Sequence, residues 1–510
     1  MIDIVGIGAL NVDFIATRTK LHSRSPDLVP EITRRFEHGT ERHVELVDVE
    51  KTIAGFGLQN FDVFLGGSAF NTIHAAARIG AGLKLGFVGV AGSSQEASAT
   101  FVDEMEALSI DASFVCREPT IPAGRCISFI SDGERSLLTT PGANVRLANY
   151  LKARRTQLLK LLANAKIVHL TSLFDSESPN VLVQLLQKAK KSNPWLRVSF
   201  DPGHEWVKTR AKWLFPLLRL SNYIFLNNRE FIELGKLAPG STDIDIASSI
   251  LSHCDDSGIL IVVKRYDSIS IFQRLQGRTI CRQVENQVLQ NDEIEDATGA
   301  GDVFAAGFLT GILVPGLEIS SAVDLGLRLA RAKLTSAGTS GFRRFPELFR
   351  AVVDTVFAAT ATEPAKKRGY VFLGHGRNQC WREVRDYLQD TLRLSCKAYE
   401  SESHSGESIT NILEDFLRNA SFAVVVLTAE DETKGGTLRA RQNVLHEIGL
   451  FQGRLGFNKV ALLVQVGLED FSNIHGLQVL RFHDGDISGA FHKLEGHLRK
   501  TGLVRRANAE

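Results

Sequence analysis

The sequence predicts an α/β protein of two units, each with a mostly parallel β-sheet covered by helices. Short apolar runs alternate with helical stretches along most of the 510 residues. This is the pattern of a right-handed parallel sheet that is buried on both faces. The alternation stops at residues 359–369, ATATEPAKKRG, where small, charged and proline residues predict a linker. A chain of this length can form two or three domains with full cores.

Composition indicates a soluble, cytoplasmic protein. Apolar residues make up 44% and charged residues 23% of the chain, as in ordinary globular proteins. The formal net charge of +1 gives no reason to expect a nucleic acid or a membrane as partner. The six cysteines include no C-x-x-C pair, which indicates reduced thiols rather than a zinc site. We expect no membrane span, because no apolar run approaches ~18 residues. The amino terminus is typical of a first strand rather than of a signal peptide.

The elements of the first unit follow from apolar runs and glycine-containing turns. Residues 2–8, IDIVGIG, end in glycine as a buried parallel strand does. Residues 18–62 are polar and weakly periodic, so we interpret them as an inserted lid. The other predicted strands are residues 86–92, 167–170, 197–201, 223–226 and 258–264, with a hairpin over 125–144 that turns at Asp132-Gly133. The predicted helices are residues 72–79, 97–108, 147–163, 179–191, 244–252, 302–313 and 319–336.

The segment EDATGAGD (295–302) carries the strongest chemical signal of this unit. Gly299 and Gly301 allow a tight turn, and an apolar helix of small residues follows directly. The N–H groups at such a helix start, together with the helix dipole, can bind an anion such as a transferring phosphate. Asp302 cannot bind phosphate by charge, so its predicted task is to take a proton from an attacking hydroxyl. The alternative is a glycine-rich helix start in which Asp302 is an ordinary capping acid.

Residues that suit a hydroxyl-bearing ligand follow the first strand and a second glycine turn. Asn11 and Asp13 come after that strand's carboxyl end, where open α/β sheets bind ligands. Gly66 and Gly67 precede a helix and permit a close backbone approach to a ligand. The Asn71 amide can both donate and accept hydrogen bonds. A plain turn is the alternative for the two glycines.

Residues 1–345 resemble the PfkB family of sugar and nucleoside kinases, with the ribokinase-like fold. The matching features, in chain order, are Asn11 and Asp13, Gly66-Gly67 followed by Asn71, Asn227-x-x-Glu230, and Asp296-x-Thr298-Gly-Ala-Gly-Asp302. The last is the family's most specific signature. The resemblance implies a doubly wound, mostly parallel sheet with a lid, and transfer of phosphate from ATP to a sugar or nucleoside hydroxyl with Mg²⁺.

The resemblance also implies roles for single residues. Asp302 would be the catalytic base, and Glu230 would hold Mg²⁺ through water. The residues that would bind substrate are Asn11, Asp13, Gly66, Gly67 and Asn71, with Asn144 near the same pocket. The residues that would bind ATP and its phosphates are Asn227, Glu230, Lys264, Thr298, Gly299, Ala300 and Gly301.

One departure from this family concerns the nucleotide. The family has a glycine-containing turn against ATP after the strand that ends here near Val263, and residues 264–269, KRYDSI, contain no glycine. The larger side chains of Arg265 and Tyr266 would therefore hinder ATP or rearrange its binding.

Residues 346–368 are predicted to be a helix (346–359) and the linker, and residues 369–510 a smaller unit with a flavodoxin-like sheet. Its predicted strands are residues 370–373, 395–399, 422–427, 460–466 and 479–482, and its predicted helices are 380–393, 407–419 and 439–456. Residues 374–378, GHGRN, follow the first strand, where a nucleotide phosphate could meet a helix start and Arg377. A loop without function is the alternative.

A second signal in this unit is the stretch RARQNVLHEIG (439–449). Asn443 and Glu447 are four residues apart and share one helical face with apolar neighbours, so we expect Glu447 to be partly buried. A surface salt bridge is the alternative for Glu447.

Residues 369–503 resemble the TIR-like nucleotide-binding domains of bacterial immune effectors. The matching segments are VFLGHGR, the helix start at Gly406, FAVVVLTAED, RARQNVLHEIGLFQGRLG and KVALLVQ. The resemblance implies that Glu447 cleaves the nicotinamide–ribose bond of NAD⁺, where a fixed carboxylate stabilises an oxocarbenium-like state. It also implies self-association into a homo-oligomer. The candidate NAD-binding residues are His375, Gly376, Arg377, Asp431, Arg439 and Asn443.

Three functions compete at this point. The first is an NAD⁺-cleaving immune effector whose kinase-like half senses or makes a small-molecule trigger. The second is a metabolic sugar or nucleoside kinase whose TIR-like half only binds nucleotide or self-associates. In the third, both halves bind ligands without turnover. The presence of both Asp302 and Glu447 favours the first.

Overall fold

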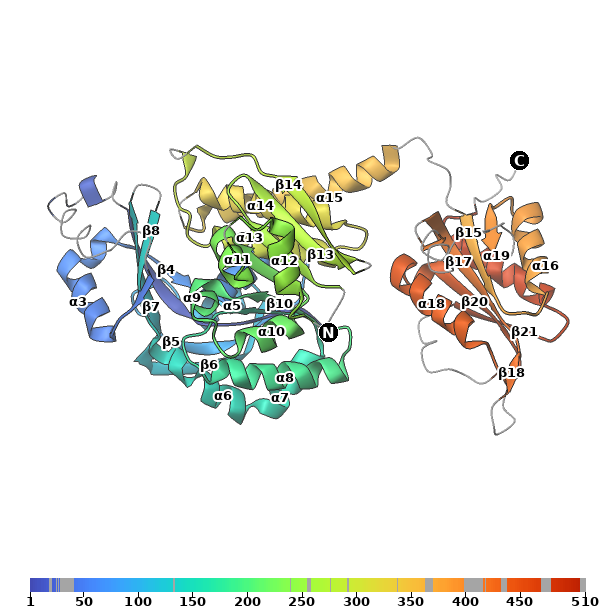
Figure 1. Ribbon diagram of the computed structural model, residues 1–510, viewed down its shortest axis with the longest axis horizontal. Helices are drawn as coiled ribbons and strands as arrows, with labels where there is room; N and C mark the ends of the chain where they lie inside the picture. The colour runs from blue at the N-terminus through green and yellow to red at the C-terminus, as the bar shows by residue number, and fades with distance from the viewer. Residues whose placement is uncertain are drawn as a thin grey trace. The chain divides into compact units, whose positions relative to one another are not determined.

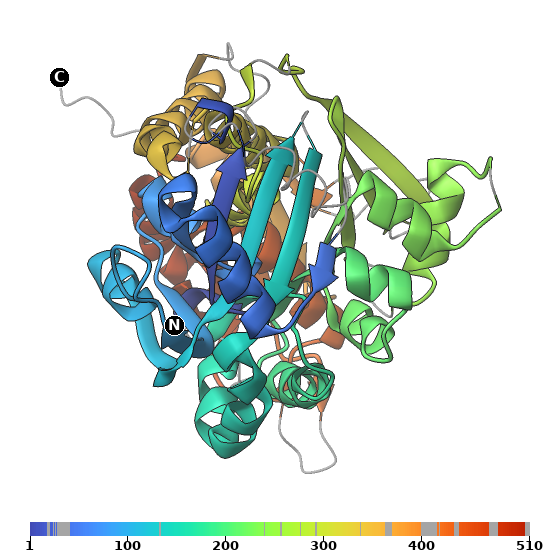
Figure 2. The ribbon, with the colours of Figure 1, turned by 90° about the vertical axis from the view of Figure 1, so that its left-hand side faces the viewer.

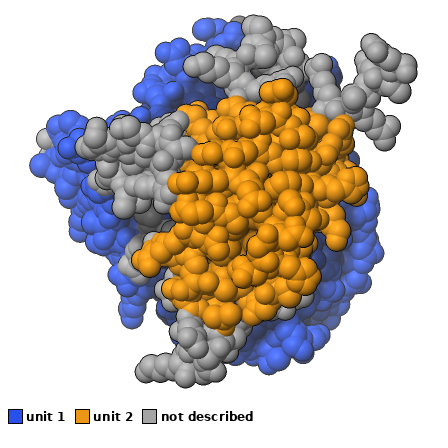
Figure 3. All heavy atoms as spheres, turned by 90° about the vertical axis from the view of Figure 1, so that its right-hand side faces the viewer, with its two compact units in different colours: residues 1–361 blue, residues 362–510 orange. Residues whose placement is uncertain are grey.

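The computed structural model describes the 510 residues except 18–20, 24, 26, 28–40, 132–133, 239, 255–257, 276, 291–292, 337, 363–369, 399–415, 418, 433–437, 469–477 and 505–510. The chain divides into two compact units, residues 1–361 and 362–510, which Figure 3 colours separately. Most of the predicted linker, residues 363–369, lies outside the described residues. Among the described residues, no helix is long and apolar enough to cross a membrane.

Unit 1 is built on a nine-stranded, mostly parallel sheet (Figure 1). Its strands, in spatial order, are β14 (Arg278–Glu285), β13 (Ser268–Leu275), β12 (Leu260–Lys264), β11 (Tyr223–Asn227), β10 (Arg197–Asp201), β9 (Ala165–Thr171), β1 (Ile2–Ile7), β5 (Leu85–Ser93) and β6 (Ile110–Pro122). The pairs β12–β13 and β13–β14 at one end of the sheet are antiparallel, and β13, β14 and β6 were not predicted from the sequence. All the other pairs are parallel, so the predicted fold class is confirmed.

Both faces of this sheet are covered, because successive residues of a strand point to opposite sides. In β11, Tyr223 and Phe225 pack into one apolar cluster with Phe304 and Phe308. Ile224 and Leu226 belong to a second cluster on the other face. This is why the strands are apolar at nearly every position rather than at every second one.

Helices on the two faces complete these clusters. The first cluster includes residues of α4, α13 and α14, and the second includes residues of α6, α7, α8 and α10. The predicted helix over 147–163 is in fact two helices that meet at Arg154. The helices of unit 1 are α3 (Leu46–Phe56), α4 (Ser68–Ile79), α5 (Phe101–Ala107), α6 (Leu147–Ala153), α7 (Arg155–Ala163), α8 (Ser178–Ser192), α9 (Gly203–Thr209), α10 (Leu214–Leu220), α11 (Asn228–Gly235), α12 (Asp243–Leu251), α13 (Ala300–Leu313), α14 (Ile319–Leu334) and α15 (Phe345–Thr362).

A second, five-stranded sheet forms the lid of unit 1 (Figure 2). Its strands, in spatial order, are β3 (Glu41–His43), β8 (Glu134–Thr140), β7 (Gly124–Ser131), β2 (Asn11–Thr17) and β4 (Asp62–Gly66). The predicted hairpin is the antiparallel pair β7–β8, although its turn at 132–133 lies outside the described residues. The lid is therefore more than the insertion at 18–62, because β2 and the hairpin belong to it as well.

Unit 2 has five parallel strands in the order β16-β15-β17-β20-β21, which is the flavodoxin-like order expected. The strands are β15 (Tyr370–His375), β16 (Cys396–Ala398), β17 (Ala420–Leu427), β20 (Val460–Gln465) and β21 (Gln478–Phe482), and the helices are α16 (Trp381–Asp386), α18 (Gln442–Leu455) and α19 (Phe491–Lys500). The helix expected over 439–456 begins only at Gln442, because Leu438–Arg439 (β19) pair with Asp431–Glu432 (β18). Most of the helix expected over 407–419 lies outside the described residues.

Candidate functional site

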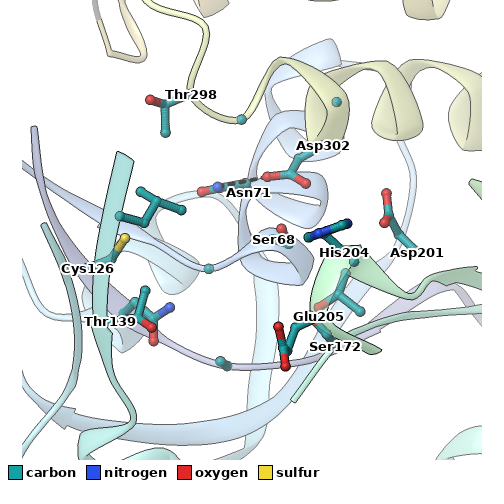
Figure 4. A pocket seen from close by; sticks show the side chains of 18 of the residues that line it. Ser68, Asn71, Cys126, Thr139, Ser172, Asp201, His204, Glu205, Thr298 and Asp302 are labelled. Atoms are coloured by element: carbon teal, nitrogen blue, oxygen red, sulfur yellow. Dashed lines mark hydrogen bonds between the residues drawn. The ribbon is translucent and has the colours of Figure 1, made fainter. Parts of the chain in front are cut away.

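A cavity of about 520 Å³ in unit 1 lies between the lid sheet, the carboxyl ends of the main-sheet strands and the start of α13. Figure 4 shows side chains from all three regions around it. Cys126 and Thr139 come from lid strands, Asp201 from the end of β10, and Asp302 from α13. The cavity thus collects polar groups from distant parts of the sequence.

The turn before α13 has the geometry of an anion-binding loop. Gly299 has φ 74°, a left-handed conformation that glycine adopts without strain, and it caps the amino end of α13. A Cβ at Gly301 would lie 3.2 Å from Lys264 Nζ, so this ammonium stands beside the loop. Ala300 does not line the cavity, and its N–H donates to the Ala297 carbonyl (3.3 Å), so its contact with a phosphate stays a prediction. The loop, Lys264 and the cavity together fit a phosphate group.

Asp302 lies in the first turn of α13 and is partly buried. Asn71 Nδ2 donates a hydrogen bond to Asp302 Oδ2 at 3.0 Å, and Figure 4 shows the two side chains facing each other. Burial raises the pKa of Asp302 to about 6; the Asn71 hydrogen bond opposes this shift, and the charge of Asp201 adds to it. A carboxylate with this pKa can accept a proton near neutral pH.

Lys264, at the end of β12, is surrounded by carboxylates. Its ammonium donates to Asp201 Oδ2 at 2.8 Å. Burial alone would lower the pKa of Lys264, but the charges of Asp201 and Glu230 outweigh it and raise the pKa. Asp201 is a cavity residue that the sequence analysis missed. Its position at the carboxyl end of a strand, directly before Pro202-Gly203, was the available signal.

Asn227 and Glu230 form the first turn of α11. The Asn227 side chain accepts from the Glu230 N–H (2.8 Å) and the Glu230 carboxylate accepts from the Asn227 N–H (2.9 Å), which is a capping box. Both residues also line the cavity. Burial and the nearby charge of Asp201 raise the pKa of Glu230 to about 7. The motif is therefore a helix start that also presents a carboxylate to the cavity.

The predicted substrate residues lie on the lid side. Asn11, Asp13, Gly67 and Asn71 line the cavity. Gly67 has φ 112° at the start of α4, and a Cβ there would lie 2.2 Å from the Ala9 carbonyl oxygen. No other residue fits that position without moving the backbone.

Two predicted substrate residues, Gly66 and Asn144, lie beside residues of the cavity lining rather than in it. Gly66 does not line the cavity; a Cβ on it would lie 2.0 Å from Asp13 Oδ2, so glycine leaves room for this carboxylate. Asn144 is buried behind the cavity. Its amide donates to Asn11 Oδ1 (3.1 Å) and to the carbonyl oxygens of Leu10 and Pro141, and it accepts from the Leu10 N–H. Asn144 therefore holds Asn11 in place.

Several further cavity residues gave no signal in the sequence. Phe174 and His43 make an edge-to-face contact with ring centroids 5.7 Å apart, and Trp206 lies on α9. Phe174 lies in the loop after β9, His43 on the lid strand β3, and Trp206 on α9. Only the folding of the chain places these three elements around one cavity. The residues of this group are His43, Cys126, Ser128, Thr139, Ser172, Phe174, His204, Glu205 and Trp206.

Arg265 and Tyr266 of the glycine-free turn are bound to the protein, and neither of them lines the cavity. Arg265 donates to Asn228 Oδ1 (2.8 Å), Asp243 Oδ2 (2.8 Å) and Ser270 Oγ (2.6 Å). The Tyr266 hydroxyl donates to the Leu289 carbonyl. These contacts hold both side chains against α11, α12 and the segment after β14, so neither narrows the cavity.

In unit 2, Glu447 lies on α18 against the end of β15. A Cβ at Gly374 would lie 2.9 Å from Glu447 Oε2, so the glycine makes room for the carboxylate. Burial raises the pKa of Glu447 to about 7. Figure 1 shows α18 beside the sheet that carries β15.

The loop after β15 is occupied by an internal carboxylate. Glu430 accepts hydrogen bonds from the N–H groups of Arg377 (2.9 Å) and Asn378 (3.1 Å) and from the Thr428 hydroxyl (2.7 Å). Burial would raise the pKa of Glu430, but these bonds outweigh it and lower the pKa. The N–H groups expected to face a nucleotide phosphate therefore already hold an anion.

The other predicted NAD-binding residues are spread out. The His375 ring stacks on Trp381 with centroids 4.1 Å apart, and its Nδ1 contacts the Gly376 carbonyl. Asp431 and Arg439 pair across the exposed two-stranded ribbon β18–β19 rather than on a helix. Asn443 lies in α18, but its side chain is outside the described residues.

These two folds and sites define a small-molecule kinase fold joined to a TIR domain, and comparison with known proteins agrees. The family model of the pfkB family carbohydrate kinases matches residues 50–344, and that of the CAP12/Pycsar effector protein TIR domain matches residues 370–484. The chain therefore belongs to the pfkB family and carries a Pycsar-type TIR domain at its carboxyl-terminal end.

Individual relatives match unit 1. An uncharacterized sugar kinase of Archaeoglobus fulgidus is 30% identical over 252 residues, 48% of this chain and 89% of that protein. The adenosine kinase of Saccharomyces cerevisiae is 26% identical over 284 residues, 54% of this chain and 79% of the relative. The structure of adenosine kinase from Schistosoma mansoni with 2-fluoroadenosine has a TM-score of 0.55 at 16% identity, covering 66% of this chain and 96% of that one. At this identity the structural likeness shows the fold.

Proposed function

We propose that the chain is a two-module enzyme that phosphorylates a nucleoside or sugar hydroxyl in unit 1 and cleaves NAD⁺ in unit 2. The observation that supports the first activity most directly is the partly buried Asp302, hydrogen-bonded to Asn71 beside the anion loop. A substrate hydroxyl near Asp302 would lie within reach of a phosphate on the loop, which is the arrangement that in-line phosphoryl transfer requires.

The chain's own residues divide the work of this transfer. Asn71 orients the Asp302 carboxylate, which takes the proton from the hydroxyl. The turn at Gly299 and the Lys264 ammonium stabilise negative charge on the transferred group. Glu230 and Asn227 would hold Mg²⁺ through water. ATP with Mg²⁺ would supply the phosphoryl group and neutralise part of its charge.

A nucleoside is the favoured substrate class. Two yeast relatives are adenosine kinases, and others are a nucleoside kinase and a cytidine kinase. The cavity lining includes four aromatic rings, those of His43, Phe174, His204 and Trp206, against which a base can stack. The carboxylate of Asp13 and the amides of Asn11 and Asn71 suit ribose hydroxyls.

The NAD⁺-cleaving activity is supported by Glu447. Its carboxylate is partly buried at the carboxyl end of β15, in a place that Gly374 leaves open. Cleavage of the nicotinamide–ribose bond places positive charge on the ribose, and a fixed carboxylate stabilises that state more than the ground state. The match to a Pycsar effector TIR domain favours a role in defence against phage, with self-association completing the site.

A second candidate function is supported by Glu430. Because this carboxylate already occupies the N–H groups of Arg377 and Asn378, unit 2 could bind nucleotide weakly without turnover. The protein would then be a metabolic kinase whose TIR domain serves in assembly.

One experiment distinguishes the two candidates. The full chain is incubated with NAD⁺ over a range of protein concentrations, with and without ATP and a nucleoside panel, while nicotinamide release and ADP formation are followed. Asp302→Ala and Glu447→Gln are the matched controls, and each should remove only one product. ADP formation with no nicotinamide under any condition supports the second candidate. If neither ADP nor nicotinamide is formed, both candidates are contradicted.

A further inference from the structure

The anion loop, residues 296–302, begins at a buried ion pair between Asp296 and Lys333. Lys333, in the last turn of α14, donates its ammonium to Asp296 Oδ2 at 2.6 Å and to the Asp296 main-chain oxygen at 3.3 Å. The two side chains are only 6% and 8% exposed. Asp296 opens the segment DATGAGD, three residues before Gly299.

The same carboxylate organises the backbone on both sides. Asp296 Oδ1 accepts from the Thr298 N–H (2.9 Å), and Oδ2 accepts from the Gly338 N–H (3.2 Å). The N–H groups of Glu295 and Asp296 donate to the Leu334 carbonyl at 2.9 and 3.2 Å. The start of the anion loop is thus fastened to the carboxyl end of α14.

The position of Lys333 is suited to a fixed positive charge. It lies at a helix carboxyl end, where the helix dipole favours cations. A buried carboxylate requires such a partner, because an uncompensated buried charge is strongly unfavourable. Lys333 does not line the 520 Å³ cavity, and its ion pair with Asp296 connects it to the loop.

A small cavity of about 40 Å³ adjoins the pair. Lys333, Asp296, Thr298, Gly299 and Asn71 all contribute to its lining. It therefore lies between the ion pair and two groups of the proposed reaction, the anion loop and the residue that orients Asp302. Removing the lysine side chain would enlarge this space enough for a small cation to enter.

We propose that Lys333 is a positioning residue, a built-in cation that holds the anion loop in its phosphate-binding conformation. The inference rests on the phosphoryl transfer proposed above for the same site. A merely structural lysine would stabilise unit 1 as a whole, whereas a positioning cation controls the loop at 296–302 in particular. A small soluble ammonium ion should then be able to replace it.

The test uses the full chain with Lys333→Ala and a matched control, Lys190→Ala. Lys190 also donates its ammonium to a main-chain oxygen, that of Leu220 (2.9 Å), and to Asn222 Oδ1 (3.1 Å), but it lines neither cavity. Amide hydrogen exchange of residues 296–302 is measured with and without methylammonium, with tetramethylammonium as the salt control. ADP formation with the best nucleoside is measured in parallel.

In Lys333→Ala we expect the amide hydrogens of residues 296–302 to exchange at least ~10-fold faster than in wild type. We expect kcat to fall ~10–10²-fold. Methylammonium should restore both, and Lys190→Ala should change neither. The double variant Lys333→Met with Asp296→Asn leaves no unpaired buried charge, so it provides a folded protein if the single variant does not fold. It should also show faster exchange in the loop.

Unchanged exchange at 296–302 in a folded variant would overturn the proposal. Faster exchange throughout unit 1 without methylammonium rescue would also overturn it, because that result describes a structural lysine. If wild type forms no ADP with any substrate while the exchange result and its rescue hold, the proposed kinase activity fails and the positioning role of Lys333 stands.

Discussion

Asp302 and Glu447 are acids whose pKa is raised by burial, and both are placed where a reaction could use them. The pKa of Asp302 is about 6, with an opposing hydrogen bond from Asn71 and the charge of Lys264. The pKa of Glu447 is about 7, with burial as its cause. Each proposed role needs the ionised form, so both activities should fall as the pH is lowered.

For Asp302 we predict that Asp302→Asn lowers phosphoryl transfer ~10²–10⁴-fold, because the hydroxyl loses its proton acceptor. In wild type, kcat/KM should rise with pH through about 6, as Asp302 becomes ionised. The pH profile of ADP formation provides the measurement. Asp324→Asn, an exposed acid paired with Arg328, is the control and should keep full activity. Equal rates for Asp302→Asn and wild type would rule out the base.

For Glu447 we predict that Glu447→Gln lowers nicotinamide release ~10²–10³-fold, because the charge that stabilises the oxocarbenium-like state is removed. In wild type the rate should rise with pH through about 7. Release from Glu447→Gln at the wild-type rate would make Glu447 structural.

The same substitution should stabilise the protein at high pH. The folded-state pKa of Glu447 lies above the ordinary glutamate value of 4.5, so the folded state binds more protons, and wild-type stability should fall as the pH rises from 4.5 to about 7. Glutamine has no charge to bury and should raise the free energy of unfolding of unit 2 at pH 8 on the order of 1–3 kcal/mol. Thermal unfolding at pH 5 and pH 8 measures this difference.

At the scale of elements, the lid is held by Arg125 on β7. Its guanidinium donates to Glu50 on α3 (3.1 Å) and to Glu96 after β5 (2.5 Å), and its side chain is 11% exposed. The next residue, Cys126, lines the cavity. This arginine therefore connects two lid elements to the main sheet directly beside the proposed substrate.

We predict that Arg125→Met loosens the lid and raises the KM for the hydroxyl substrate ~10-fold, with a smaller change in kcat. The free energy of unfolding of unit 1 should fall by about 1–3 kcal/mol, less than for a fully buried pair because Glu50 is half exposed. Steady-state kinetics and thermal unfolding are the measurements. Arg117→Met is the control, because the Arg117–Glu106 pair is exposed. If Arg125→Met has the same KM as wild type, the ion pairs of Arg125 do not control the lid.

At the scale of the whole molecule, each unit has its own apolar cores. Unit 1 contains two large clusters on the faces of its sheet, and unit 2 contains two smaller ones. Each unit can therefore fold alone, and their fusion in one chain favours a functional link rather than a shared core.

We predict that a ligand of the unit 1 cavity changes the rate of nicotinamide release by unit 2 by ~5–100-fold, the usual range of coupling between sites. A ligand shifts such an equilibrium only by its different affinity for the two states, so Asp13→Ala should weaken the effect without changing the basal rate. The assay compares the full chain with a fragment that begins near residue 366. If fragment and full chain respond identically to every ligand, there is no coupling.

The sequence by itself determined the fold class of both units, because strands that are apolar at every position and glycine turns before helices depend on local chemistry. It also predicted roles for Asp302 beside its glycine turn and for Glu447, since each belongs to a contiguous motif on one turn or helix face; both roles stay predictions. Asn227 and Glu230, which the sequence predicted to lie near the phosphates, line the cavity. Asn71 donates a hydrogen bond to Asp302.

Only the tertiary structure decided which residues meet across long sequence distances. Asp201 reaches Lys264 from 63 residues away, and Asn144 holds Asn11 from 133 residues away. It also showed that Arg265 is bound by Asn228, Asp243 and Ser270 rather than facing the cavity. Such contacts depend on how strands and helices pack, because a side chain's partner is set by the neighbouring element, which local sequence does not encode.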